Sequence, residues 1–282
     1  MGIFGVLLNL VCGVIFFYLD EFRKPAFLLM GNLCFIDALE LICNAIYGGL
    51  RLLIDPDTVY YADVIFGFII YVNWLLAATF FGLISYNRYI TIRYWSKVDS
   101  FFGKKQLVFF MLAPYLILYP LHLTYYHTVD SQMCVWRSQF FTYELMPKFP
   151  EFFNSAWVLA AAVIQICFNL LTQRSMRSAC STLSAATLAQ ERKLNIQCWT
   201  TSAFFLGTTI MYQVCFFVMQ FKIYTPGVSW FIGMHLVWIC NHCCNPVIYL
   251  SFNQPLRAAV RNMLRYPRRA TATVDVVTTT AT

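Results

Sequence analysis

Charged residues are scarce in this chain. Asp, Glu, Lys and Arg together make up 12% of its 282 residues, whereas hydrophobic residues make up 60%. A soluble domain is about 25% charged and about 45–50% apolar, so an ordinary soluble globule is excluded. Disordered, collagen-like and nucleic-acid-binding chains need polar or biased sequence, and they are excluded too. The class that remains is an integral membrane protein.

The sequence also lacks a disulfide framework. Most of its 11 cysteines lie inside apolar runs, where cysteine behaves as a small hydrophobe. The net charge of +7 does not require a nucleic-acid partner, because basic residues gather on the cytoplasmic side of membrane proteins.

Seven apolar stretches approach the roughly 20 residues that a membrane-spanning helix needs. The first is the shortest, and only eight residues precede Asn9. A truncated or non-functional product is therefore one interpretation of this sequence. A signal peptide is the alternative, but the start has no basic residue and no small-residue cleavage site. We expect residues 1–266 to form one all-α membrane domain, a seven-transmembrane helix bundle with spans at 2–19, 25–49, 61–88, 106–126, 151–172, 196–221 and 228–250.

The distribution of Lys and Arg predicts the orientation, because cytoplasmic loops carry the excess of positive charge. With the N-terminus outside, only four of the 20 basic residues fall on the outer side: Arg51, Arg137, Lys148 and Lys222. The sequence therefore predicts an N-out, C-in arrangement. Asp63 and several other acids belong to the predicted outer face.

Polar residues interrupt the apolar spans at specific places, and charge at membrane depth needs a reason. Asn9 lies in the first span and Asp37 in the second. Asn87-Arg88-Tyr89 closes the third span, and the last span contains a run of polar residues from Asn241 to Tyr249.

These positions carry a resemblance to the rhodopsin-like G-protein-coupled receptors, over nearly the whole chain. The strongest motif is N-x-C-x-N-P-x-x-Y in the seventh span. The second is Asn87-Arg88-Tyr89, where the family has D/E-R-Y, and the third is the spacing of Leu33 and Asp37. The full seventh-span motif consists of Asn241, Cys243, Asn245, Pro246 and Tyr249.

The resemblance implies roles for the cytoplasmic half. Arg88, with Tyr89 beside it, would engage a heterotrimeric G protein, while Pro246 would act as a hinge near Asn245. Tyr249 would swing inward on activation. The acidic residue that normally holds the arginine is replaced by Asn87, so we expect Glu191 to take its place and the inactive state to be weakly locked.

The resemblance also implies a polar core around Asp37, in which a sodium ion would bind. Oxygen ligands suit a hard cation. Ala77 stands where the family often has a serine, and the alternative is a hydrogen-bonded or protonated Asp37 without an ion. The expected partners of Asp37 are Asn73, Asn241, Asn245 and Asn9.

Other family features are missing. Ile239 occupies the position of the retinal Schiff-base lysine, so no retinal cofactor is expected, and Ile70 occupies the position of the amine-binding aspartate. The sixth span lacks its usual proline, and the third span has no cysteine for the usual disulfide to Cys134. A bundle with these losses is similar to the nematode serpentine chemoreceptors, with class X or T as the candidates.

A ligand pocket is expected to open outward between the third, fifth, sixth and seventh spans. Its character would suit a small, mostly apolar molecule, although ordinary core packing is the alternative for each residue. His235 and His242 lie on one face, but no third metal ligand is evident. The expected lining is Ile70, Tyr71, Trp74, Tyr212, Phe216, His235 and Trp238.

Residues 253–265 form a basic amphipathic pattern, which predicts a helix on the inner leaflet. The Thr-rich cytoplasmic tail at 267–282 is a candidate substrate for a receptor kinase with arrestin as a partner, or else a solvated disordered tail. Its threonines are Thr271, Thr273, Thr278, Thr279, Thr280 and Thr282.

The sequence therefore predicts a chemosensory receptor in the plasma membrane, for example of sensory cilia. The alternative is a seven-helix transporter or ligand-gated channel subunit, but no internal repeat supports a transporter. An intramembrane enzyme is not expected, because Asp37 and Glu40 are the only acids well inside a span and they share one helix.

Overall fold

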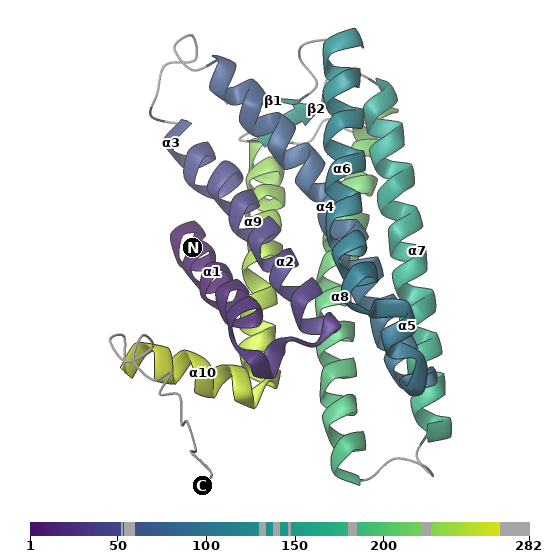
Figure 1. Ribbon diagram of the computed structural model, residues 1–282. Coiled ribbons are helices and arrows are strands. Elements are labelled where there is room, and N and C mark those ends of the chain that lie inside the picture. The colour runs from purple at the N-terminus through teal and green to yellow at the C-terminus, as the bar shows by residue number, and fades with distance from the viewer. Residues whose placement is uncertain are drawn as a thin grey trace, which may run out of the picture.

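The computed structural model describes residues 1–51, 53, 60–129, 134–137, 142–145, 148–179, 185–221 and 227–265. Long helices run side by side in a bundle, and one short helix lies across its end (Figure 1). The predicted tail at 267–282 lies outside the described residues.

Seven helical segments make up the bundle. They are α1 (Gly2–Tyr18), α2 (Pro25–Leu41) continued by the π-helical turn η2 (Ile42–Tyr47) and α3 (Gly48–Arg51), α4 (Tyr60–Arg93), α6 (Lys104–Val129), α7 (Lys148–Ala179), α8 (Ala185–Gln220) and α9 (Val228–Phe252). The seven predicted spans therefore each correspond to a helix.

Five of the described helices are long and apolar enough to cross a membrane: Pro25–Arg51, Tyr61–Arg93, Lys104–Thr124, Phe152–Ser178 and Val228–Phe252. Helix α1 is apolar but has only 17 residues. Helix α8 has 36 residues, and its first turns are polar. The remaining helical elements are short: η1 (Asp20–Phe22), η4 (Trp95–Lys97), α5 (Val98–Phe102) and α10 (Gln254–Arg265).

Two helices extend further at the cytoplasmic end than their apolar stretches. Helix α4 runs to Arg93, so Arg88 lies inside the helix rather than at its close. Helix α8 begins at Ala185, before the predicted span at 196–221, so Glu191 lies within the helix. Amphipathic continuation beyond the apolar core explains both, because a helix can extend polar turns into water.

The interior is rich in aromatic side chains, and α4 is the central helix, packed against α2, α6, α7 and α8. Near the α10 end, the ring centroid of buried Phe16 lies 5.6 Å from those of Phe22 and Phe27 and 5.8 Å from that of Tyr249. Such ring pairs contribute about 0.5–1.5 kcal/mol each beyond burial of area. They join α1, α2 and α9.

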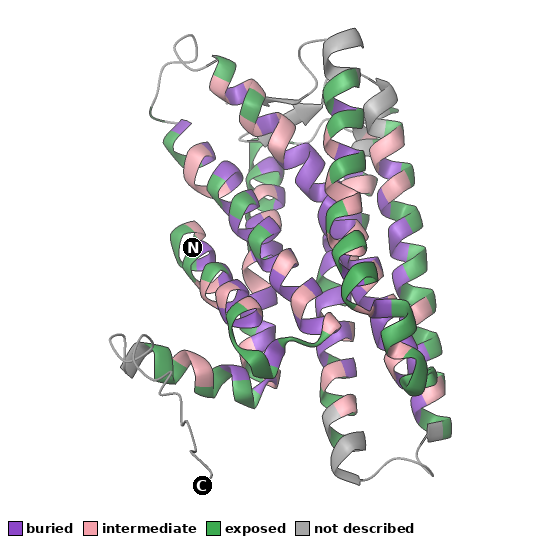
Figure 2. Ribbon diagram, viewed as in Figure 1, coloured by how far each residue is buried: buried purple, intermediate pink, exposed green. Residues whose placement is uncertain are grey.

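The helices of the bundle expose many residues on their outward sides (Figure 2), and large hydrophobic side chains are among them. Helix α6 exposes several large hydrophobic side chains, which are Val108, Phe109, Leu112, Leu116, Ile117, Leu121 and Leu123. In water such a surface would drive association, whereas in a bilayer it is the expected helix exterior.

Helix α10 lies crosswise at the end of α9 (Figure 1). Asn253 Oδ1 accepts a hydrogen bond from the Leu256 backbone N–H at 3.1 Å, which caps the helix. Leu256 is fully buried, and Arg257 donates to the carbonyls of Leu250 and Ser251 at 2.7 and 2.6 Å. The buried leucine and the arginine bonds fix the turn between the two helices.

A feature without a sequence prediction is a two-stranded antiparallel hairpin, β1 (Cys134–Arg137) and β2 (Thr142–Leu145), in which Cys134 pairs with Leu145. Strand β1 packs near α4.

Candidate functional site

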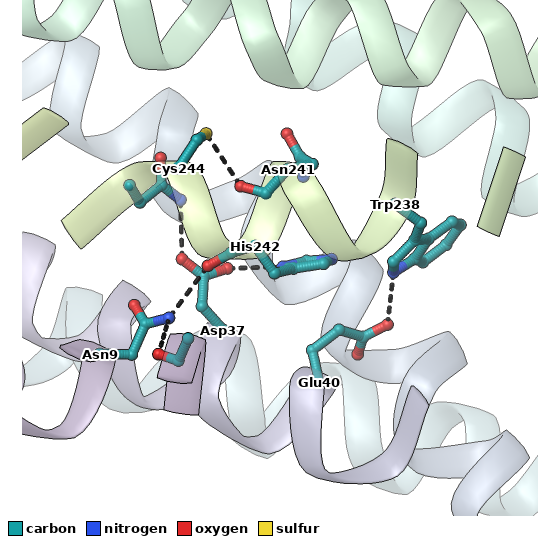
Figure 3. Close-up of polar contacts among 9 residues, drawn as sticks. Asn9, Asp37, Glu40, Trp238, Asn241, His242 and Cys244 are labelled. Carbon is teal, nitrogen blue, oxygen red and sulfur yellow. Dashed lines mark hydrogen bonds and ion pairs between the residues drawn. The ribbon is translucent and has the colours of Figure 1, made fainter. Parts of the chain in front are cut away.

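Asp37 of α2 is the centre of a buried polar cluster, and it faces α9. Its Oδ1 lies 2.7 Å from Nδ1 of His242, and its Oδ2 accepts a hydrogen bond from Asn245 Nδ2 at 2.7 Å (Figure 3). Asp37, His242 and Asn245 are each only 1% exposed. His242 and Asn245 are three residues apart on α9 and therefore share one face of that helix.

Asn9 ties α1 to the same cluster, but not through Asp37. Its Nδ2 donates to the backbone carbonyl of His242 at 2.9 Å and to that of Gly5 at 3.0 Å (Figure 3). Asn9 is fully buried. It therefore holds α1 against the part of α9 that carries His242.

Two other predicted partners of Asp37 make different contacts. Asn73 Oδ1 accepts a hydrogen bond from the Tyr119 hydroxyl of α6 at 3.2 Å. The backbone carbonyl of Asn241 accepts from Cys244 Sγ at 3.0 Å. Of the expected set, only Asn245 bonds Asp37 among the described residues.

Glu40, one turn along α2, makes a second link to α9. The Trp238 indole N–H donates to Glu40 Oε1 at 3.0 Å, and Glu40 is fully buried (Figure 3). This contact of Glu40 was not predicted from the sequence, in which Glu40 was only one of two acids inside a span. Its spacing of three residues from Asp37 was the available signal, because residues so spaced share a helix face.

Part of the expected ligand pocket comes together as an aromatic cluster. The Trp238 ring centroid lies 4.4 Å from that of Trp74 and 4.5 Å from that of Tyr212. Ile70 is buried on α4, and the Tyr71 ring packs on His122 of α6 at 4.8 Å. The structure thus joins α4, α8 and α9 through three rings.

The other two pocket candidates do not add to this cluster. His235 is partly buried on α9, two turns from His242. The side chain of Phe216 lies outside the described residues. Within the residues that the structure describes, no group of three His, Cys, Asp or Glu side chains is placed to hold a metal ion.

At the other end of the bundle, Arg88 of α4 forms an ion pair with Glu191 of α8 through its Nη2 and the glutamate Oε2. Arg88 is 4% exposed and Glu191 is 19% exposed. The neighbouring Asn87 is buried, and neither of its side-chain polar atoms has a hydrogen-bond partner in the described structure. Tyr89 packs its ring on Phe168 of α7, with centroids 5.7 Å apart.

Pro246 lies inside α9, one turn before Tyr249. Tyr249 is 1% exposed, and its ring meets Phe16 edge-on. Pro246 removes one backbone donor from the helix. Pro246 and Tyr249, both predicted to take part in a switch, therefore lie between the Asp37 cluster and helix α10.

The sequence did not predict one buried polar site. Arg51 and Asp63 counted as charges of the outer face, but both are buried between α3 and α4. Arg51 Nε lies 2.9 Å from both carboxylate oxygens of Asp63, and the Tyr47 hydroxyl donates to Oδ1 at 2.8 Å. The π-helical turn η2 precedes this site, and such a turn changes which face the following residues present.

Comparison with known proteins decides the family. A family model described as "Serpentine type 7TM GPCR chemoreceptor Srt" matches residues 1–273. The chain belongs to the Srt family. This corresponds to the class T candidate of the sequence analysis, and the residues that carried the resemblance lie within the matched range.

The Srt chain is also similar to part of a curated relative and to a solved structure. A segment of 31 residues is 48% identical to the probable G-protein coupled receptor K01A12.3 of Caenorhabditis elegans, and it covers 11% of this chain and 6% of that protein. The crystal structure of squid rhodopsin superposes with a TM-score of 0.63 at 15% identity, covering 97% of this chain and 85% of that one. The rhodopsin likeness establishes the seven-helix fold.

Proposed function

We propose that this Srt protein is a chemosensory receptor that couples a small extracellular molecule to a heterotrimeric G protein. The observation that carries the proposal is the Arg88–Glu191 ion pair between α4 and α8. An outward movement of α8 would break this pair and free Arg88 to contact the G protein. Ligand binding would act by shifting the balance between two states of the bundle.

The strength of the ion pair sets the free energy that the ligand must supply to this switch. Glu191 is partly exposed, so solvent screening limits the pair to about 1 kcal/mol. Removing such a contribution from the inactive state raises the active population about 5-fold where that state is rare. The lock is therefore weak, because Asn87 adds no negative charge beside Arg88.

The experiment measures G-protein activation in cells, without ligand and with a ligand panel. Glu191→Gln should raise basal signalling about 5-fold, and Arg88→Ala should abolish signalling. Arg192→Ala, a change at the exposed neighbour of Glu191, is the matched control and should have no effect. A Glu191→Gln receptor that reaches the surface with unchanged basal signalling would contradict the proposal.

The ligand is proposed to contact the cluster of Trp74, Tyr212 and Trp238. Three aromatic rings favour a small, mostly apolar molecule, and buried Glu40 next to Trp238 adds one acceptor for a hydroxyl or amine. The panel should therefore include short alcohols, ketones, esters and amines. Tyr212→Ala should weaken the response to an active compound while basal signalling stays normal.

The cellular setting follows from the same proposal. The receptor would lie in the plasma membrane, with the C-terminus inside, in sensory cilia if the cell is a sensory neuron. The threonines of the tail at 267–282 would receive phosphate from a receptor kinase and recruit arrestin.

A further inference from the structure

The rhodopsin-like fold raises the question of whether a sodium ion binds beside Asp37. A hard cation needs several oxygen ligands around it. Asp37 supplies two oxygens, but His242 Nδ1 lies on one and Asn245 Nδ2 lies on the other, each at 2.7 Å. The hydrogen-bonding positions that face α9 are thus filled by protein nitrogen atoms.

The side-chain oxygens of Asn9 and Asn245 are buried without a hydrogen-bond partner, but in each amide the nitrogen is the atom that bonds within the cluster. Asn245 presents its amide nitrogen, and the Asn9 amide nitrogen is directed to the backbone carbonyl of His242. Asn73 Oδ1 is bonded to Tyr119. Ala77, a buried residue of α4, carries no polar atom. Because both Asp37 oxygens already bond a nitrogen atom, this arrangement does not fit a sodium ion on Asp37.

His242 is held firmly in this position. Its side chain is 1% exposed, and its ring centroid lies 6.0 Å from that of Trp238 and 6.3 Å from that of Trp74. An ionised carboxylate can only accept a hydrogen bond, so Nδ1 carries the proton towards Asp37. The neutral Nδ1–H ring and the imidazolium both satisfy this.

We infer that His242 is a built-in partner of Asp37 that replaces a bound sodium ion. The contact joins α2 to α9 through a side chain of the protein instead of through a bound ion. Sodium concentration then has no influence on the stability of the inactive bundle. The inference concerns a regulatory property of the proposed receptor, but the contact itself is independent of G-protein coupling.

The test is the melting temperature of the purified full-length protein in detergent micelles, in sodium chloride and in N-methylglucamine chloride of equal ionic strength. This readout needs no ligand and no G protein, so it separates failure of this inference from failure of the proposed function. The variants are His242→Ser, which exchanges the ring for a hydroxyl oxygen, and the double variant Ala77→Ser with His242→Ser. His235→Ser, two turns away on α9, is the matched control.

Wild type and His235→Ser should melt at the same temperature in both salts. His242→Ser or the double variant should melt about 2 °C or more higher in sodium, because a ligand that binds only the folded state raises its stability. A sodium-dependent shift in wild type that Asp37→Asn abolishes would overturn the inference. No shift in any variant would also overturn it, because His242 would then not be the group that excludes the ion. If the variants fail to fold, the melting temperatures of wild type in the two salts still test the inference.

Discussion

The buried ion pair between Arg51 and Asp63 gives the sharpest prediction about stability. The change is Asp63→Asn, which keeps the size of the side chain and removes its charge. The two side chains are 5% and 3% exposed, and Arg51 Nε lies 2.9 Å from both carboxylate oxygens. The substitution leaves a buried guanidinium without this carboxylate and weakens the bond from the Tyr47 hydroxyl.

The expected cost follows from the burial. Removing one partner of a buried pair destabilises a protein by about 3–5 kcal/mol. For a chain of this size each kcal/mol lowers the melting temperature by about 2–4 °C, so the expected drop is on the order of 10 °C. Because the usual disulfide at the outer end has no partner cysteine in the third span, we expect this pair to fix the outer ends of α3 and α4.

The assay is thermal unfolding of the detergent-purified protein, followed by fluorescence. The matched control is Asp20→Asn, because the Asp20–Arg23 pair is 83% and 66% exposed and its loss should leave the melting temperature unchanged. Replacing both members of the buried pair by Met and Leu should restore stability close to wild type. An Asp63→Asn protein that melts within about 2 °C of wild type would refute the reasoning.

Three further predictions concern other contacts. Asn87→Asp should lower basal G-protein signalling, since it places a carboxylate beside Arg88; an unchanged basal level in surface-expressed receptor would count against a weak lock. Trp238→Phe should lower the melting temperature by a few degrees, because it removes the N–H donor of buried Glu40 at a cost of about 1–3 kcal/mol; stability equal to wild type would rule out that role. Asn253→Ala should cost about 1 kcal/mol through loss of the α10 cap, and hydrogen exchange should show faster opening of that helix.

Composition and hydrophobic pattern were enough to predict the class of protein and the order of its helices. Composition excluded a soluble fold, because 60% apolar residues cannot be covered by so few charges. Spacing within one helix was also readable, since residues three or four apart share a face. The family resemblance allowed Arg88 and Glu191 to be paired in advance, because Glu191 carries the negative charge that Asn87 lacks.

Which side chain meets Asp37 depends on how the helices pack. The motif placed Asn241, His242 and Asn245 close together on one helix, but the rotation of α9 about its own axis selects which of them faces α2. That rotation depends on packing against α1, α2 and α8, which no local pattern records. For the same reason His242 was not recognised as the partner of Asp37, and Asn73 was assigned to Asp37 although it bonds Tyr119.

The Arg51–Asp63 pair at the outer end of the bundle is a second contact that packing determines and the sequence pattern does not. Charge counting placed Arg51 and Asp63 on the outer face, because the N-out arrangement puts that end of the predicted spans outside. The structure instead continues α2 through a π-helical turn and extends α4 to Tyr60, which buries both residues against each other. Burial of a charge depends on whether an opposite charge from another helix can reach it, and this is settled only when the helices pack.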